Sequence, residues 1–267
     1  MSENDEASVQ RYASIIVVGG GCYGSYYVRQ LERAARAGAL VADEIVVVDR
    51  DPVCAVVRDR AVHETEGPLP LRIVQADWHE FFAEYLDRAA DVRASVGDAI
   101  VPSPLMPHLM GEWLVSRARH RFRGRSVETP PVDRVPHVPW ERGGADGTHY
   151  VSFATWICPV NCIEPRTCPH TRDTRSWSLP VRIGEHAREE TAAGRPLVAA
   201  TLFCRHRAYG VGMFDTAEVV DADARIAAAG SAGAAEVLIG TLSHCHGALT
   251  RLVIGPPAAA PSDSHVA

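Results

Sequence analysis

Hydrophobic residues in the first part of the chain follow two alternating patterns. Uninterrupted aliphatic or β-branched runs predict buried strands, which we expect at 14–18, 44–48, 71–75 and 98–101. Apolar side chains that recur every three or four residues predict helices at 22–37, about 52–60, 79–90, and through Trp113 to about Arg119. Strands that alternate with helices in this way are typical of an open parallel α/β sheet.

The second half of the chain is less regular. Residues 123–147 are rich in Pro, Gly and Arg, which is typical of a linker. Beyond them we expect an Ala-rich helix near 222–229 and strands at 149–157, 197–204, 208–214, 236–241 and 249–254. Residues 148–255 are therefore expected to extend the first sheet or to form a small second domain. Residues 1–12 and 256–267 are expected to be disordered, which leaves 13–122 as the first domain.

Composition limits both the chemistry and the surroundings of the protein. The chain has 267 residues and a net charge of −6, and all 27 of its basic residues are arginine. Without lysine, mechanisms that need a Schiff-base lysine, a P-loop lysine or a Ser-Lys pair are excluded. The acidic balance argues against nucleic acid as the main partner. No apolar run approaches the ~20 residues of a membrane span, and the polar N-terminus is unlike a secretory signal, so we expect a cytoplasmic protein without membrane insertion.

A glycine-rich turn carries the clearest functional signal. Gly19, Gly21 and Gly24 match the pattern G-x-G-x-x-G between a predicted strand and a predicted helix, with Cys22 and Tyr23 inside the motif. The first glycine permits a tight turn, the second lets the backbone approach a pyrophosphate, and the third lets the helix pack closely against the strand. The helix N-terminus offers unpaired amides to the phosphates. We therefore expect an adenine-containing dinucleotide or nucleoside to bind here.

A carboxylate at the end of the second predicted strand supports this interpretation. Asp49 is placed to accept hydrogen bonds from ribose hydroxyls, and a carboxylate there disfavours a 2′-phosphate. NAD is therefore preferred to NADP, although the neighbouring Arg50 weakens that preference.

Residues 14–120 resemble the Rossmann superfamily of NAD-binding domains through the glycine motif and Asp49. They are also similar to class I S-adenosylmethionine-dependent methyltransferases, in which the turn would hold the methionine moiety, Asp49 the ribose and Asp77 the adenine. The segment PSPLMPH after the fourth strand does not match that family's NPPY-like motif. The resemblance implies a Rossmann-like parallel sheet of the α/β class for this part of the chain, to which we expect the second half to add a C-terminal cysteine-rich α+β extension or small second domain. It implies NAD as the cofactor, with S-adenosylmethionine as the alternative.

A cysteine-rich loop in the second half suggests a metal. Cys158, Cys162 and Cys168 lie within eleven residues, and proline follows the first and the third. Clustered thiols in a reducing compartment are typical ligands of soft metals and iron–sulfur clusters. We expect Cys245 as the fourth ligand, with Cys204 and His170 as alternatives. The C-x3-C-x5-C spacing matches neither a zinc finger nor a ferredoxin. A 4Fe-4S cluster is favoured because Arg166, Arg172 and Arg175 in the same loop could offset its negative charge, with zinc as the alternative, and three unliganded thiols stay open.

Three histidines are candidate proton donors or acceptors. His108 follows the fourth predicted strand, where ligands of open α/β sheets bind, and His244 and His246 flank Cys245. Arginines alternate with other residues from 117 to 125, a pattern that as a strand would place five guanidinium groups on one face.

Together these signals predict a redox protein that binds NAD and a thiolate-held metal centre. It would move hydride or electrons between the nicotinamide and the metal or a small substrate, with a small molecule or a protein as its redox partner. One alternative is a methyltransferase with a structural zinc. Another is a non-catalytic nucleotide-sensing or electron-transfer subunit of a larger complex, and a homo-oligomer is also open.

Overall fold

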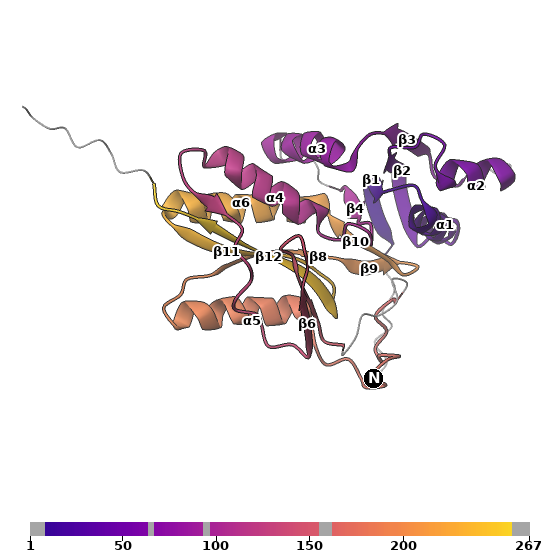
Figure 1. The fold of residues 1–267 in the computed structure, drawn as a ribbon. Helices are drawn as coiled ribbons and strands as arrows, with labels where there is room; N and C mark the ends of the chain where they lie inside the picture. The colour runs from indigo at the N-terminus through magenta and orange to yellow at the C-terminus, as the bar shows by residue number, and fades with distance from the viewer. Residues whose placement is uncertain (1–8, 64–66, 93–96, 155–161, 258–267) are drawn as a thin grey trace, which may run out of the picture.

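The structure is a computed structural model that describes residues 9–63, 67–92, 97–154 and 162–257. Within these residues the architecture is mixed α/β, with six helices packed against two mixed β-sheets (Figure 1). The helices are α1 (Cys22–Arg36), α2 (Ala55–His63), α3 (Trp78–Val92), α4 (Leu109–Arg121), α5 (Leu179–Ala192) and α6 (Thr216–Ala232).

The first sheet has the strand order β3-β2-β1-β4-β10-β9. Its strands are β1 (Gln10–Val18), β2 (Leu40–Asp49), β3 (Leu71–Gln75), β4 (Ala99–Val101), β9 (Arg205–Ala208) and β10 (Val211–Asp215). The strands β3, β2, β1 and β4 run parallel, whereas β10 is antiparallel to β4 and β9 is antiparallel to β10. The parallel part is therefore built from the first 101 residues, and the other two strands come from the second half of the chain.

Both faces of the parallel strands are buried, because successive side chains of a strand point to opposite sides. In β1, Ile15 and Val17 pack with Val28 and Leu31 of α1, whereas Ile16 and Val18 belong to the hydrophobic core that includes Phe82 of α3. The continuous aliphatic runs of β1 and β2 are the sequence pattern that such two-sided burial produces.

The second sheet has the strand order β6-β7-β12-β11-β8, and β5 pairs with β12 beside this path. Its strands are β5 (Val127–Glu128), β6 (Trp140–Gly143), β7 (His149–Ser152), β8 (Val198–Phe203), β11 (Ala235–Leu242) and β12 (His246–Ile254). Only the pair β8–β11 is parallel among the described pairs of this sheet. Helix α5 covers one face, and α4 and α6 lie on the other (Figure 1).

The two sheets share one core. Ile16 of β1, Phe214 of β10, and Val237 and Leu252 of the second sheet belong to the same buried cluster as the apolar faces of α3, α4 and α6. The second half of the chain therefore both extends the first sheet, through β9 and β10, and forms a second sheet from its other strands. The sequence leaves these two arrangements open as alternatives.

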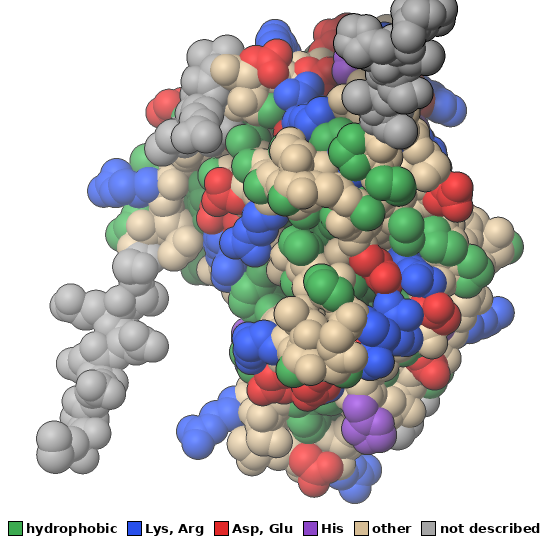
Figure 2. All heavy atoms as spheres, turned by 90° about the vertical axis from the view of Figure 1, so that its left-hand side faces the viewer, with side chains coloured by type: hydrophobic (Ala, Val, Ile, Leu, Met, Phe, Trp, Pro, Cys, Tyr) green, Lys and Arg blue, Asp and Glu red, His purple; other side chains and the backbone are tan. Residues whose placement is uncertain are grey.

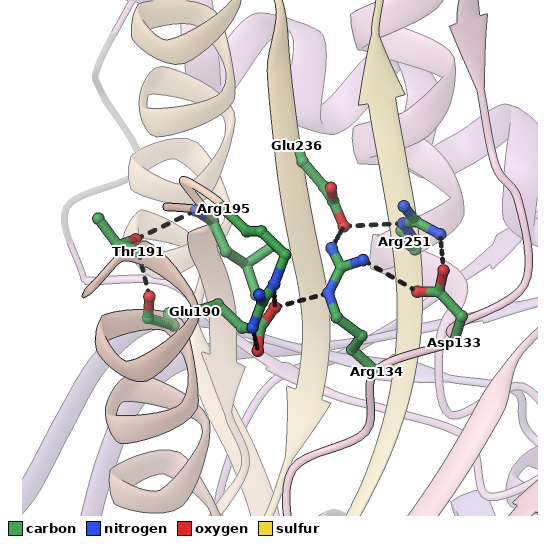
Figure 3. Close-up of polar contacts among 9 residues, drawn as sticks. Asp133, Arg134, Glu190, Thr191, Arg195, Glu236 and Arg251 are labelled. Carbon is green, nitrogen blue, oxygen red and sulfur yellow. Dashed lines mark hydrogen bonds and ion pairs between the residues drawn. The ribbon is translucent and has the colours of Figure 1, made fainter. Parts of the chain in front are cut away.

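A network of ion pairs joins α5 to the face of the second sheet that is opposite α4 and α6. Arg134 lies between Glu190 of α5, with Nε 2.6 Å from the carboxylate, and Glu236 of β11, at 2.5 Å (Figure 3). Arg251 of β12 bonds Glu236 at 2.8 Å and Asp133 at 2.8 Å. Residues 133–134 therefore hold the connection after β5 across α5, β11 and β12 (Figure 3).

Several predicted elements differ from the structure. Strand β1 begins at Gln10, inside the expected disordered lead-in, and the expected linker contains β5 and β6. The helix α5 was not predicted at all. The arginines from 117 to 125 do not form a strand, because α4 continues through Arg121. None of the helices in the described ranges combines the length and apolar character that a membrane span needs.

Candidate functional site

The glycine turn has the close packing that its motif predicts. Gly19 has φ of +87°, in the left-handed region that glycine adopts readily, and its N–H donates to the Val48 carbonyl at 2.9 Å. A Cβ atom on Gly24 would lie 2.0 Å from the carbonyl oxygen of Gly19. The first turn of α1 can therefore approach the end of β1 only because residue 24 has no side chain.

The middle glycine is open. Gly21 is the residue before α1, so no side chain caps the start of that helix. A Cβ atom placed on Gly21 would have no neighbouring atom within 4 Å. The first amides of a helix have no acceptor within the helix, so those at the start of α1 are suited to a ligand, whereas the N–H groups of Gly19 and Gly20 are bonded to Val48 and Asp49. Gly20 is different, since a Cβ there would lie 2.3 Å from the sulfur of Cys54.

Asp49 is tied directly to this turn. Its Oδ2 accepts a 2.6 Å hydrogen bond from the N–H of Gly20, and its Oδ1 accepts one of 2.8 Å from the N–H of Asp51. The carboxylate thus lies at the carboxyl end of β2, beside the turn that follows β1.

Arg50 and Asp77 form an ion pair that occupies both side chains. Asp77 also accepts the N–H of His79 at 2.8 Å and that of Glu80 at 3.3 Å, so it caps the start of α3. The hydrogen bond from Arg50, together with these amides, lowers the pKa of Asp77. The next residue, Trp78, donates its indole N–H to the Val48 carbonyl at 2.9 Å and packs against Gly19.

A cavity of about 290 Å³ lies beyond the carboxyl end of β4, and we call it the sheet-edge cavity. The segment 102–107 after β4 and Tyr27 of α1 form part of its wall. The rest comes from the second half of the chain, which contributes Cys162, Glu164, Cys204, His206, Ser243 and His246 among others. The carboxyl edge of parallel strands is where open α/β sheets bind ligands.

Glu164 is the central charged group of this cavity. It accepts hydrogen bonds from Ser243 Oγ at 2.5 Å and from the N–H groups of Cys245 and His244 at 2.8 and 3.1 Å, and His206 Nδ1 lies 3.7 Å away. Burial raises the pKa of this carboxyl, but the hydrogen bonds outweigh burial and lower the pKa to about 2. An ionised carboxylate therefore holds the turn between β11 and β12 against the cysteine loop.

Glu164 was missed from the sequence. Its backbone is in the left-handed region, with φ of +50°, which an ordinary side chain adopts at a cost. Nothing in the segment Ile-Glu-Pro distinguishes this glutamate from a surface one, because the donors that bind it are about 80 residues further along the chain.

Two thiols near Glu164, those of Cys204 and Cys245, are held in the protonated form. Burial, with the charge of Glu164, raises the pKa of Cys204 and of Cys245 to about 12. Cys162 shares the sheet-edge cavity with Cys204, whereas Cys245 accepts the indole N–H of Trp177 at 3.2 Å. Cys168 is engaged in a turn of its own loop, where its N–H donates to the Asp173 carbonyl.

The predicted metal ligands are not gathered by the part of the chain that the structure describes. Among those residues, no three His, Cys, Asp or Glu side chains lie close enough to hold one ion. The described residues include Cys162, Cys168, Cys204, Cys245 and His170. Cys158 lies outside the described residues. The 4Fe-4S cluster, and zinc as its alternative, therefore stay predictions.

The three candidate histidines have different surroundings. His108 is buried between two threonines, with Nδ1 3.0 Å from Thr241 Oγ1 and Nε2 3.1 Å from Thr250 Oγ1, and burial lowers its pKa to about 4. His244 packs edge-on against Phe203, and its Nδ1 lies 3.2 Å from Ser178 Oγ. Both histidines have the packing expected of structural residues.

His246 is the one of these three that lines the sheet-edge cavity. Its Nδ1 lies 3.0 Å from the hydroxyl of the fully buried Ser152. Its Nε2 is buried and has no hydrogen-bond partner among the described residues. Burial lowers the pKa of the imidazole, with Glu164 acting in the opposite direction, so the ring is neutral at pH 7. An orphaned ring nitrogen at a cavity wall is a site for a ligand hydrogen bond.

Comparison with known families places most of these residues in one unit. The family model described as AF_1314_C, "Uncharacterized protein, C-terminal domain", matches residues 110–255, which is more than half of the chain. The chain belongs to the AF_1314_C family. No curated protein and no solved structure matches it.

The AF_1314_C match contains Glu164, Cys204, His206 and His246, but it begins at residue 110 and so excludes the glycine turn and Asp49. The sheet-edge cavity therefore combines this domain with Tyr27 and the segment 102–107, which precede it.

Most of the arginines between residues 117 and 125 make contacts within the protein. Arg117 pairs with Asp87, Asp91 and Asp223, and Arg121 also pairs with Asp223. Arg125 donates to the carbonyls of Gly230, Gly233 and Gly255. On the face that Figure 2 presents, basic and acidic side chains are likewise interspersed.

Proposed function

We propose that the chain binds NAD at the glycine turn and carries out hydride transfer with a small substrate in the sheet-edge cavity. The observation that carries the proposal is the hydrogen bond from Gly20 N–H to Asp49 beside the open Gly21, at the carboxyl edge of parallel strands in the order β3-β2-β1-β4. That combination supports a Rossmann-like nucleotide site, because phosphates need open amides and the ribose needs a carboxylate acceptor.

The surroundings of Asp49 favour NAD over both alternatives. The Arg50 guanidinium, which could bind a 2′-phosphate, is paired with Asp77. Asp77, which the methyltransferase resemblance assigns to the adenine, is occupied by Arg50 and by the amides at the start of α3. Neither side chain is therefore free for the role that NADP or S-adenosylmethionine would require.

When bound, a nicotinamide supplies the hydride donor or acceptor. The chain's own contribution is proton handling and positioning in the cavity. In the tautomer protonated at Nδ1, His246 donates to Ser152 Oγ and leaves its Nε2 lone pair free to take the proton of a substrate hydroxyl. Glu164 keeps the turn that carries His246 in place through Ser243 and the Cys245 N–H.

A thiolate-held metal is not part of this proposal. The described donors do not come together in threes, and the raised pKa values of Cys204 and Cys245 make these two thiols poor ligands as they stand. Iron, sulfide and zinc analysis of protein purified without oxygen tests the metal prediction separately.

The proposal is tested by calorimetric titration of the protein with NAD, NADP and S-adenosylmethionine. We expect NAD to bind most tightly. Gly21→Ala should abolish that binding with little effect on folding, because its Cβ has free space in the protein but would occupy the place of the phosphate. Gly124→Ala is the matched control, since its Cβ also meets no atom within 4 Å. Preferred binding of S-adenosylmethionine, or a Gly21→Ala protein that binds NAD normally, would contradict the proposal.

A further inference from the structure

A second and larger cavity lies along α4, and its lining includes no residue of the glycine turn. It has a volume of about 580 Å³ and is formed by α3, α4, the turn between β6 and β7, and Thr250 of β12. We call it the α4 cavity. Its inner wall is apolar and includes Phe82, Leu109 and Trp113, all of which are buried. The volume lies in the range of small-molecule sites.

At the rim of the α4 cavity, Arg119 lacks a carboxylate partner among the described residues, and the two rim carboxylates, Glu112 and Asp146, lack an arginine partner. Arg119 makes one long hydrogen bond, 3.4 Å to Thr129 Oγ1, and no carboxylate of the described residues pairs with it. Glu112 bonds His79 at 2.9 Å, and Asp146 accepts only from Thr148, so neither carboxylate has an arginine partner within the described ranges. This contrasts with the neighbouring Arg117 and Arg121, which are both ion-paired.

The fold keeps these opposite charges apart. Glu112 and Arg119 are seven residues apart on α4, about two turns, so they lie on the same side of the helix and about 10 Å apart along its axis. Asp146, on the turn between β6 and β7, also lines the cavity. The cavity thus has an acidic end, a basic end and an apolar wall between them.

We propose that the α4 cavity binds a short peptide, or a molecule of the same form, with a free amine at one end and a free carboxylate at the other. The amine would bind Glu112 and Asp146, and the carboxylate would bind Arg119. An extended tripeptide spans about 10 Å, which matches the spacing of the charges, and an apolar middle side chain would pack against Trp113 and Phe82. This site is separate from the proposed nucleotide site.

The test is calorimetric titration of the full chain with the tripeptide Ala-Phe-Ala at low ionic strength. N-acetylated and C-amidated forms of the same peptide remove one terminal charge each. We expect the free peptide to bind and each blocked form to bind about tenfold more weakly. Arg119→Gln should weaken binding of the free peptide about tenfold but leave binding of the C-amidated form unchanged. Glu112→Gln should likewise weaken binding of the free peptide about tenfold but leave binding of the N-acetylated form unchanged.

Matched controls separate the cavity from general surface charge. Arg123→Gln removes an exposed arginine just beyond the end of α4, and Glu84→Gln removes an exposed glutamate of α3, and neither residue lines the cavity. Both should bind the peptide normally, and so should Gly21→Ala. Absence of binding at millimolar peptide, or equal binding of free and blocked peptides, would overturn the proposal whatever the outcome with NAD.

Discussion

The backbone N–H of Gly20 donates a 2.6 Å hydrogen bond to the carboxylate of Asp49, which joins the end of β2 to the turn between β1 and α1. The two residues are 29 positions apart in the chain. The bond fixes the carboxylate close to Gly21, where the backbone is open. Because the other oxygen of Asp49 accepts the N–H of Asp51, a ribose hydroxyl would have to donate to a second lone pair of one of these two oxygens.

The glycines of the turn should differ sharply in their tolerance of a methyl group. Gly24→Ala would place a Cβ 2.0 Å from the Gly19 carbonyl oxygen, which is backbone and cannot move aside. We expect a loss of about 3 kcal/mol in the free energy of unfolding, or failure to fold. Gly21→Ala should change it by less than about 1 kcal/mol. Urea unfolding followed by circular dichroism measures both, and equal losses would contradict this account of the turn.

Releasing Arg50 should change the nucleotide preference. Asp77→Asn removes the ion pair with Arg50 but keeps a side-chain oxygen for the start of α3, since asparagine caps helices as well as aspartate. Under the proposed function, NADP affinity should rise about tenfold because the freed guanidinium can bind the 2′-phosphate. NAD affinity should change little.

The control for that experiment is Asp51→Asn, which frees Arg58 instead of Arg50. It should leave the ratio of NAD to NADP affinity unchanged. If Asp77→Asn gives the same ratio as the wild-type protein, Arg50 does not approach the ribose.

His108 should make stability depend on pH. Its pKa is about 4 in the folded protein, below the ordinary value of 6.5, because burial disfavours the charged ring. Only the unfolded chain takes up the proton between these values, so stability falls by about 3 kcal/mol as the pH decreases from 6.5 to 4. His108→Gln should remove this part of the pH dependence. The exposed His137 is the control, and its replacement by glutamine should leave the wild-type curve.

Glu164 should stabilise the protein through its charge. Glu164→Gln replaces an acceptor-only carboxylate by a group with one carbonyl oxygen, so part of the bonding from Ser243 and Cys245 is lost. We expect a loss of about 2 kcal/mol near neutral pH. The folded pKa of about 2 lies below the ordinary 4.5, so the advantage of the wild type is present above pH 4.5 and declines as the pH falls toward 2. Glu84→Gln should show neither effect, and a constant difference across this range would contradict the assignment.

Local patterns in the sequence were sufficient for the parallel strands and the glycine turn. The aliphatic runs at 14–18 and 44–48 mark β1 and β2 because both strands are buried on two faces. The glycine spacing reflects contacts between neighbours in the chain, such as Gly24 against Gly19, so a motif could identify it.

Features that depend on distant contacts could not be predicted in this way. Helix α5 contains Gly184, which weakens its local signal, and it is held in place by packing of Leu179 and Ile183 on the second sheet. The sheet-edge cavity needs β9 and β10 to pass from the second half of the chain into the first sheet, a topology that periodicity does not encode. The role of Glu164 depends on the same long-range arrangement.

The antiparallel pairing of β10 with β4 has a consequence for how this protein can be divided. Phe214 is paired with Ile100, which precedes the AF_1314_C match, so residues 110–255 expressed alone would expose an unsatisfied strand edge and a stripped apolar surface. We expect such a fragment to aggregate. In any relative with the same C-terminal half, we expect another strand to pair with β10. A partner that supplies a matching strand edge for β10 should restore the solubility of the fragment.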